Sequence, residues 1–149
     1  MIIDTEKHIK NLLDSYHNLT GLYLIPKNLK IENLKDYFDQ LDFVLLSHGT
    51  EADPILNYGN RKAYTLWEMP LEEFLKTPSR KTAEVPLREE RERLLQNVSQ
   101  KGFINDYSGI RITKTGKRFQ IHQATVWNVT DETGIKIGQA ATFKNYTFL

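Results

Sequence analysis

The sequence contains no cysteine in 149 residues, which excludes disulfide bonds, thiolate metal sites and cysteine nucleophiles. It also lacks an excess of charge of one sign, because 20 Lys and Arg residues balance 19 Asp and Glu residues to a formal charge of +1. Proteins dedicated to binding nucleic acid need a basic surplus that displaces counterions from phosphates. We therefore expect no nucleic-acid partner.

Long hydrophobic runs are missing as well. A bilayer-spanning helix needs about 20 apolar residues, whereas the longest run here, residues 43–46, has the length of a strand. The N-terminus is charged by Asp4 and has no apolar segment typical of a signal peptide. We expect a cytoplasmic protein without membrane attachment, of one domain's length and with enough apolar content for a core.

Residues 1–40 are predicted to form an N-terminal helical extension. Asp4 is placed to cap a first helix and Gly21 to end it, and a second short helix is predicted at 31–38. The first helix is amphipathic and needs a surface to cover. Its apolar residues recur at helical spacing at Ile9, Leu12, Leu13, Tyr16 and Leu19.

Residues 41–149 are predicted to form the main domain. Strands are expected at 43–48 and 55–58, and short helices at 60–67 and from Pro70, before a longer helix over 86–101. One side of that longer helix carries Leu87, Arg91, Leu94, Leu95 and Val98.

The C-terminal third has no helical period and predicts three long strands joined by turns at 114–117 and 131–134. Five antiparallel strands with helices gathered on one face, plus the N-terminal helices, make an α+β domain. Strict alternation along the middle strand would place one set of side chains on the face turned towards the helices: Phe119, Ile121, Gln123, Thr125, Trp127 and Val129. The last strand would add Ile137, Gln139, Ala141 and Phe143.

Several motifs resemble known families. The segments ILNYGNRKA (55–63), MPLEEF (69–74) and KTGKRF (114–119) resemble signatures of the PAS domain. The segments LSHGTEADP (46–54), DYSGIRI (106–112), QATVWNV (123–129) and FKNYTFL (143–149) look like the MEKHLA family, a PAS-like group. The chain resembles the free-standing microbial form of that family, because the DNA-binding and zipper modules of the plant proteins do not fit in its length.

The resemblance implies a PAS-like fold and a non-catalytic regulatory role. PAS domains sense small molecules, light or redox state, or mediate protein association. The expected partners are therefore a small molecule, another protein, or a second copy of the chain in a homodimer through the N-terminal helix.

The expected ligand pocket lies between sheet and helices. Its polar candidates are Gln123, Thr125 and Gln139, which need hydrogen-bond partners when buried, and its walls are Trp67, Phe119, Trp127 and Phe143. An internal hydrogen-bond network or trapped water would satisfy the same groups and is the favoured alternative. Arg80 and Arg111 are candidate contacts for an anionic ligand.

The loop His48, Gly49, Thr50, Glu51, Asp53 carries the family motif. Its titratable groups could form the acid–base cluster of a small enzyme, but a turn fixed by local hydrogen bonds is the favoured interpretation. The four histidines have no metal-ligand spacing, so no metal is expected.

The cofactor stays open. A cysteinyl flavin adduct is excluded, and haem ligation through the long helix is not expected because 86–101 contains no His. Gln139 resembles a flavin-contacting position of photoreceptor PAS domains, which keeps non-covalent flavin as an alternative. The leading hypothesis is a sensory domain that binds a small molecule or a protein. The alternatives are an interaction module with a filled core and the small enzyme.

Overall fold

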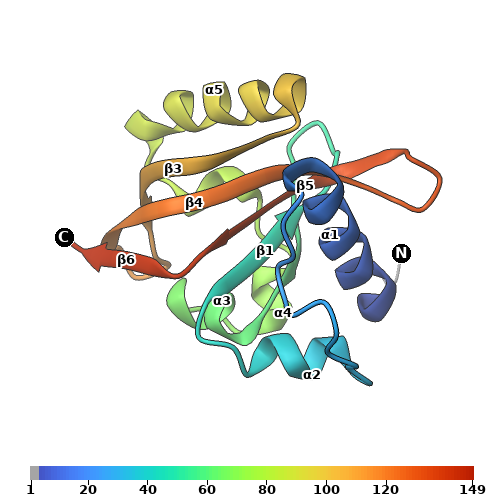
Figure 1. Cartoon of the computed structure of the whole chain (residues 1–149). Helices are drawn as coiled ribbons and strands as arrows, with labels where there is room; N and C mark the ends of the chain where they lie inside the picture. Colours follow the sequence, from blue (N-terminus) through green and yellow to red (C-terminus); the bar gives the residue numbers. More distant parts are fainter. Residues whose placement is uncertain (1–3) are drawn as a thin grey trace.

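The computed structural model describes residues 4–149, apart from the side chains of residues 85–87. Its centre is an antiparallel sheet with the strand order β2-β1-β5-β4-β3, in which β6 pairs with β4 beyond the end of β5 (Figure 1). The strands are β1 Val44–His48, β2 Leu56–Gly59, β3 Phe103–Ile112, β4 Arg118–Thr130, β5 Lys136–Phe143 and β6 Asn145–Phe148. The α+β fold class is confirmed, and the C-terminal tail adds a sixth strand to the five predicted.

Helices cover both faces of this sheet (Figure 1). We call the face covered by α3, α4 and α5 the inner face, and the face covered by α1 the outer face. The helices are α1 Thr5–Thr20, α2 Leu34–Asp39, α3 Arg61–Leu66, α4 Leu71–Phe74 and α5 Val85–Lys101, with a 3-10 turn η1 at Ser79–Thr82. None of the helices in the described chain is long and apolar enough to cross a membrane.

Local chemistry fixes the helix ends. The Asp4 side chain accepts a hydrogen bond from Lys7 N at 3.2 Å, and Gly21 ends α1 at φ 74°. Asn60 starts α3 by accepting from Ala63 N, and its amide also reaches the carbonyls of Phe38 and Phe43, both at 2.9 Å. Asn60 therefore joins α3 to the segment that enters β1.

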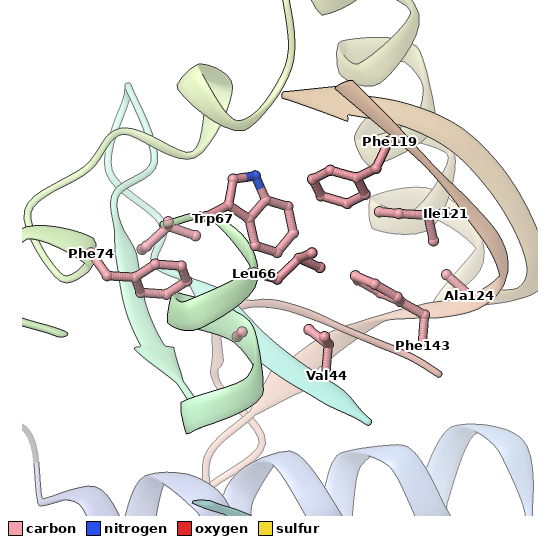
Figure 2. Packing of buried hydrophobic residues seen from close by; sticks show 10 residues of the cluster. Val44, Leu66, Trp67, Phe74, Phe119, Ile121, Ala124 and Phe143 are labelled. Carbon is pink, nitrogen blue, oxygen red and sulfur yellow. The ribbon is translucent and has the colours of Figure 1, made fainter. Parts of the chain in front are cut away.

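The inner face carries an aromatic core around Trp67. Its indole packs edge-on against Phe119 at 5.2 Å between ring centroids, and Phe143 lies at 6.3 Å (Figure 2). Phe74 from α4 closes the other side of the indole. This core fills the space under α3 and α4, and a smaller cluster of Leu94, Val98 and Val126 lies under α5.

The outer face is buried by α1. Ile9 and Leu12 are fully buried, and the Trp127 indole packs edge-on against Tyr16 with 5.1 Å between centroids. Trp127 Nε1 donates a hydrogen bond to the Leu12 carbonyl at 3.2 Å. The apolar side of α1 thus finds the surface it needs within its own chain.

The predicted alternation of β4 is wrong beyond Ile121. Ile121 pairs with Gly109 and Ala124 with Tyr107, so β4 holds one more residue than β3 there, and Gln123 adopts φ 52°. A bulge of this kind reverses which side chains face each side of the sheet. Ala124 and Val126 consequently face inward, whereas Trp127 and Val129 pack with α1.

Candidate functional site

A cavity of about 70 Å³, measured as the space open to the centre of a water-sized sphere, lies between the inner face, η1 and α5. A single water needs about 10–15 Å³ by this measure, so the cavity has room for a few waters or a small ligand. The lining residues come from six elements, which makes the cavity a product of the tertiary fold. Apolar lining is supplied by Leu46, Leu94, Leu95, Ile121, Ala124, Val126, Ala141 and Phe143.

Two arginines line the cavity among these apolar side chains. Arg91 from α5 is only 4% exposed and Arg111 from β3 only 9%. Arg91 Nη2 donates to Ser79 Oγ, and Arg111 Nη1 donates to the Ile110 carbonyl at 3.0 Å. Arg111 also lies over the Tyr107 ring, 5.4 Å from its centroid.

The charges of these arginines are weakly compensated. Within the described chain, the one carboxylate within 4 Å of either guanidinium is that of Glu92, 3.8 Å from Arg91 Nη1, and its side chain is 61% exposed. Burial, together with the neighbouring Arg111 charge, lowers the pKa of Arg91 to about 10. Arg91 therefore keeps its proton at neutral pH, and this part of the cavity wall is cationic.

Two more polar groups of the lining are unsatisfied. His48 Nδ1 lies 3.0 Å from the Gly49 carbonyl and must donate to it, which leaves Nε2 as a buried acceptor without a partner in the described chain. Burial lowers the pKa of His48, which favours this neutral form. Trp67 Nε1 is a buried donor that likewise lacks a described partner.

Gln139, in contrast, is satisfied. Its amide nitrogen donates to the Leu95 carbonyl at 2.9 Å and to Asn128 Oδ1 at 3.1 Å. Asn128 Nδ2 in turn donates to the carbonyls of Val98 and Ser99. This network fixes α5 to the sheet and corresponds to the internal alternative that the sequence left open for Gln139.

The other predicted pocket residues do not all meet. Trp67, Phe119 and Phe143 lie together on the inner face, and Trp67, Phe143 and Gln139 line the cavity. Thr125 and Trp127 do not line the cavity, because the bulge turns Trp127 towards α1 and Thr125 lies on the same side of the strand as Trp127. Gln123 is exposed and does not line the cavity either. The prediction that all seven residues wall one pocket is therefore wrong, and their role in binding stays a prediction.

Of the two predicted anion contacts, one lines the cavity. Arg111 does, but Arg80 lies at the surface, where its Nε donates to both Asp53 carboxylate oxygens at 3.2 and 3.1 Å. Arg91 was not singled out as a site residue. The one indication in the sequence is its position as the single charged residue on the apolar side of α5.

The loop after β1 has the geometry of a fixed turn. Glu51 Oε1 accepts from Ile55 N at 3.2 Å, and Asp53 is paired with Arg80. Of the titratable loop residues, only His48 lines the cavity. His48 and Glu51 also line a surface hollow beside α5, which Thr50 lines as well, but Asp53 does not, so the three titratable side chains do not converge on one cleft. Gly49 N donates to the Ile55 carbonyl at 3.0 Å and closes the turn.

Cofactor chemistry finds little support in these residues. The described chain holds no group of three His, Asp or Glu side chains able to bind a metal ion. A flavin ring system fits poorly, since the cavity suits a group of a few heavy atoms and the Gln139 amide is already engaged. The sequence also lacks the cysteine of a flavin adduct.

Solved structures show which class this fold defines. A PAS domain from Colwellia psychrerythraea is similar at a TM-score of 0.61 and 14% identity, covering 76% of this chain and 92% of that one. The PAS domain of a LuxR-family transcriptional regulator from Burkholderia thailandensis, in complex with ethanol, is similar at a TM-score of 0.57 and 15% identity. The alignment covers 78% of this chain and 97% of that one. The light-state dimer of the fungal blue-light photoreceptor Vivid is similar at a TM-score of 0.59 and 12% identity, and the alignment covers 95% of this chain and 93% of that one. The fold is that of the PAS domains.

Within this class, the model of the MEKHLA domain matches residues 6–148. The chain therefore belongs to the MEKHLA domain family, as its motifs predicted. The match begins at residue 6 and so covers α1 from its second residue onwards. No protein of curated function matches the chain.

Proposed function

We propose that this chain is a regulatory PAS-like module that binds a small molecule in the cavity between the inner face and α5. The observation that carries the proposal is the pair of buried unpartnered polar atoms, His48 Nε2 and Trp67 Nε1, on two residues of one cavity. A buried polar atom without a partner costs about 1–3 kcal/mol, and a bound ligand or water would remove that cost.

The sheet supplies a route by which occupancy reaches the rest of the molecule. Gln139, Ala140 and Ala141 of β5 line the cavity, and Ala140 also packs with the α1 cluster. A ligand that shifts β5 therefore also changes the packing of α1. Binding selects those conformations of the chain in which β5 accommodates the ligand and α1 still packs on the outer face. A cytoplasmic location and a protein partner that reads this change belong to the same proposal.

The test uses the two indole N–H signals in an NMR spectrum. Trp67 belongs to the cavity, whereas Trp127 is bonded to Leu12 on the other face and serves as an internal control. We expect small alcohols, amides or carboxylates to shift the Trp67 signal and not the Trp127 signal, with Trp127→Phe providing the assignment. Ala141→Leu should abolish the shift by filling the cavity.

The matched control is Ala52→Leu, the same change on an exposed loop residue. It should leave the Trp67 response unchanged. If no compound class moves the Trp67 signal, and Ala141→Leu merely stabilises the protein, the chain is the interaction module with a filled core, and the proposal fails.

A further inference from the structure

The chemistry of the cavity narrows the class of ligand. Buried guanidinium groups are normally paired with carboxylates, because leaving such a charge in an apolar setting is costly. Here two of them, Arg91 and Arg111, line one cavity, and the nearest described carboxylate is the largely exposed Glu92. The site therefore carries positive charge that its own residues do not neutralise.

The remaining lining determines what kind of anion fits. Leu94, Val126 and Ala141 offer an apolar wall, which favours a ligand with a hydrocarbon end over a fully hydrated inorganic ion. Trp67 Nε1 adds one neutral donor. The volume of about 70 Å³ limits the ligand to a few heavy atoms.

The arginines also mark a route of entry. Both line a second, surface groove between α5 and β3, together with Tyr107, Gln120 and the exposed Glu90. Arg91 and Arg111 therefore line both the cavity and this surface groove. An anion that enters through this groove, where the two guanidinium charges outnumber the one carboxylate of Glu90, would meet the arginines before the apolar end of the cavity.

We propose that the cavity binds a small organic carboxylate, with the carboxylate group held by Arg91 and Arg111 and the hydrocarbon end against Leu94, Val126 and Ala141. This inference rests on the proposed function, because it names the ligand class of the same cavity. Guanidinium groups suit the task, since their planar N–H pairs match the two oxygens of a carboxylate.

The first measurement compares isosteres of different charge. Butyrate, butyramide, 1-butanol and butylamine are titrated into the protein, and the Trp67 indole signal reports binding. We expect butyrate to bind at least about tenfold more tightly than the amide and the alcohol, and butylamine not to bind. Inorganic phosphate should bind more weakly than butyrate.

The second measurement removes the charges one at a time. Arg91→Met and Arg111→Met should each remove the preference of the site for butyrate over butyramide, while Arg91→Lys should retain part of it. The matched control is Arg80→Met, which removes a surface arginine that is paired with Asp53, and it should change nothing.

A stability readout separates a binding role from a structural one. If Arg91 serves the ligand, Arg91→Met should leave the unfolding midpoint of the free protein unchanged or raise it, because a poorly compensated buried charge is lost. If Arg91 were required to hold Ser79 and η1, the same variant would lower the unfolding midpoint. That result would refute the proposal that Arg91 serves to hold the carboxylate of the ligand.

The two proposals fail differently. Equal affinity for butyrate and its neutral isosteres, unaltered in both methionine variants, overturns the carboxylate and leaves the small-molecule site intact. Equal affinity for phosphate and butyrate overturns the proposal that the ligand is organic and binds partly through its hydrocarbon end. A Trp67 signal that no compound moves overturns the ligand site itself.

Discussion

At the scale of single residues, Gln123 has a backbone conformation that is rare for a residue with a side chain. Its φ of 52° lies in the left-handed region, in the middle of β4. The bulge around it decides that Ala124 faces the inner core and Trp127 faces α1. The conformation of this one residue therefore determines which side chains in the second half of β4 face the inner layer and which face the outer layer.

The first residue-scale prediction concerns this conformation. Gln123→Val should lower the free energy of unfolding by about 1–3 kcal/mol, because a β-branched residue is strained at positive φ. Gln123→Gly should cost less, since glycine adopts that φ freely. Denaturant unfolding measures both, with Gln120→Val at a regularly paired position as the control. Equal stability of the Val and Gly variants would show that the strain is absent.

The second residue-scale prediction concerns two histidines, the buried His8 and the half-buried His48. Burial lowers the pKa of each from its ordinary value of 6.5. Ser47 donates to Asn57 at 2.5 Å, so His8 Nε2 must donate to Ser47 Oγ, which the neutral ring does. The neighbours of His48 that act on its charge are Arg91, Glu51 and Lys136.

The sign of the pH dependence follows from these lowered values. The unfolded chain binds protons at both histidines before the folded chain does, so the free energy of unfolding should fall as the pH drops from about 7 to about 5. His8→Gln and His48→Gln should each flatten this slope, measured by denaturant unfolding across that range. His122→Gln serves as the control, and an unchanged slope in both variants would contradict the assignment.

At the scale of elements, α1 is part of the folded core. Leu12→Ala should lower the free energy of unfolding by about 2–5 kcal/mol, because Leu12 is fully buried against the outer face. Trp127 emission should shift to the red as water reaches its indole. Lys10→Ala, on the exposed side of the same helix, is the control.

The same variant tests the predicted homodimer through the N-terminal helix. The apolar side of α1 is already used within the chain, so Leu12→Ala should change stability without changing oligomeric state in analytical ultracentrifugation. Loss of a dimer in step with the loss of Leu12 would show instead that two copies share this helix. The division of the chain at residue 40 stays a prediction.

Elements were predictable where their determinants are local. Asp4, Asn60 and Gly102 end or begin helices through hydrogen bonds or dihedral angles of neighbouring residues, and the sequence alone predicts α1, α3 and α5 from them. The bulge of β4 is different, because it arises from pairing with β3, which alternation cannot reveal. The side-chain faces after Ile121 were therefore assigned wrongly, although the strand itself was found.

The cavity was only partly predictable for the same reason. Trp67, Phe143, Gln139 and Arg111 were identified from their types and their strands, and they do line it. Identifying Arg91 required the knowledge that α5 packs on β3 and β4. In the sequence it is one charged residue in an apolar stripe, a pattern that solvent-facing arginines also produce.

At the scale of the whole molecule, the sheet separates two layers of different kinds. The outer layer under α1 is dominated by apolar packing around Trp127, and the inner layer under α5 contains the cavity and its two arginines. The proposed binding cavity and the packing of α1 thus lie on opposite sides of the same strands, and substitutions on one side can be tested against readouts on the other.

The bulged strand also determines where the chain tolerates a change of length. Deleting or inserting one residue within β4 before Ala124 would exchange the two layers, placing Trp127 against the cavity and Ala124 against α1. The hairpin turns after β3 and β4 lie outside this constraint, because Gly116 and Gly134 have no atoms within 4 Å of an added Cβ. Reporter tags or circularly permuted ends therefore belong in those turns, where they would leave both layers in register.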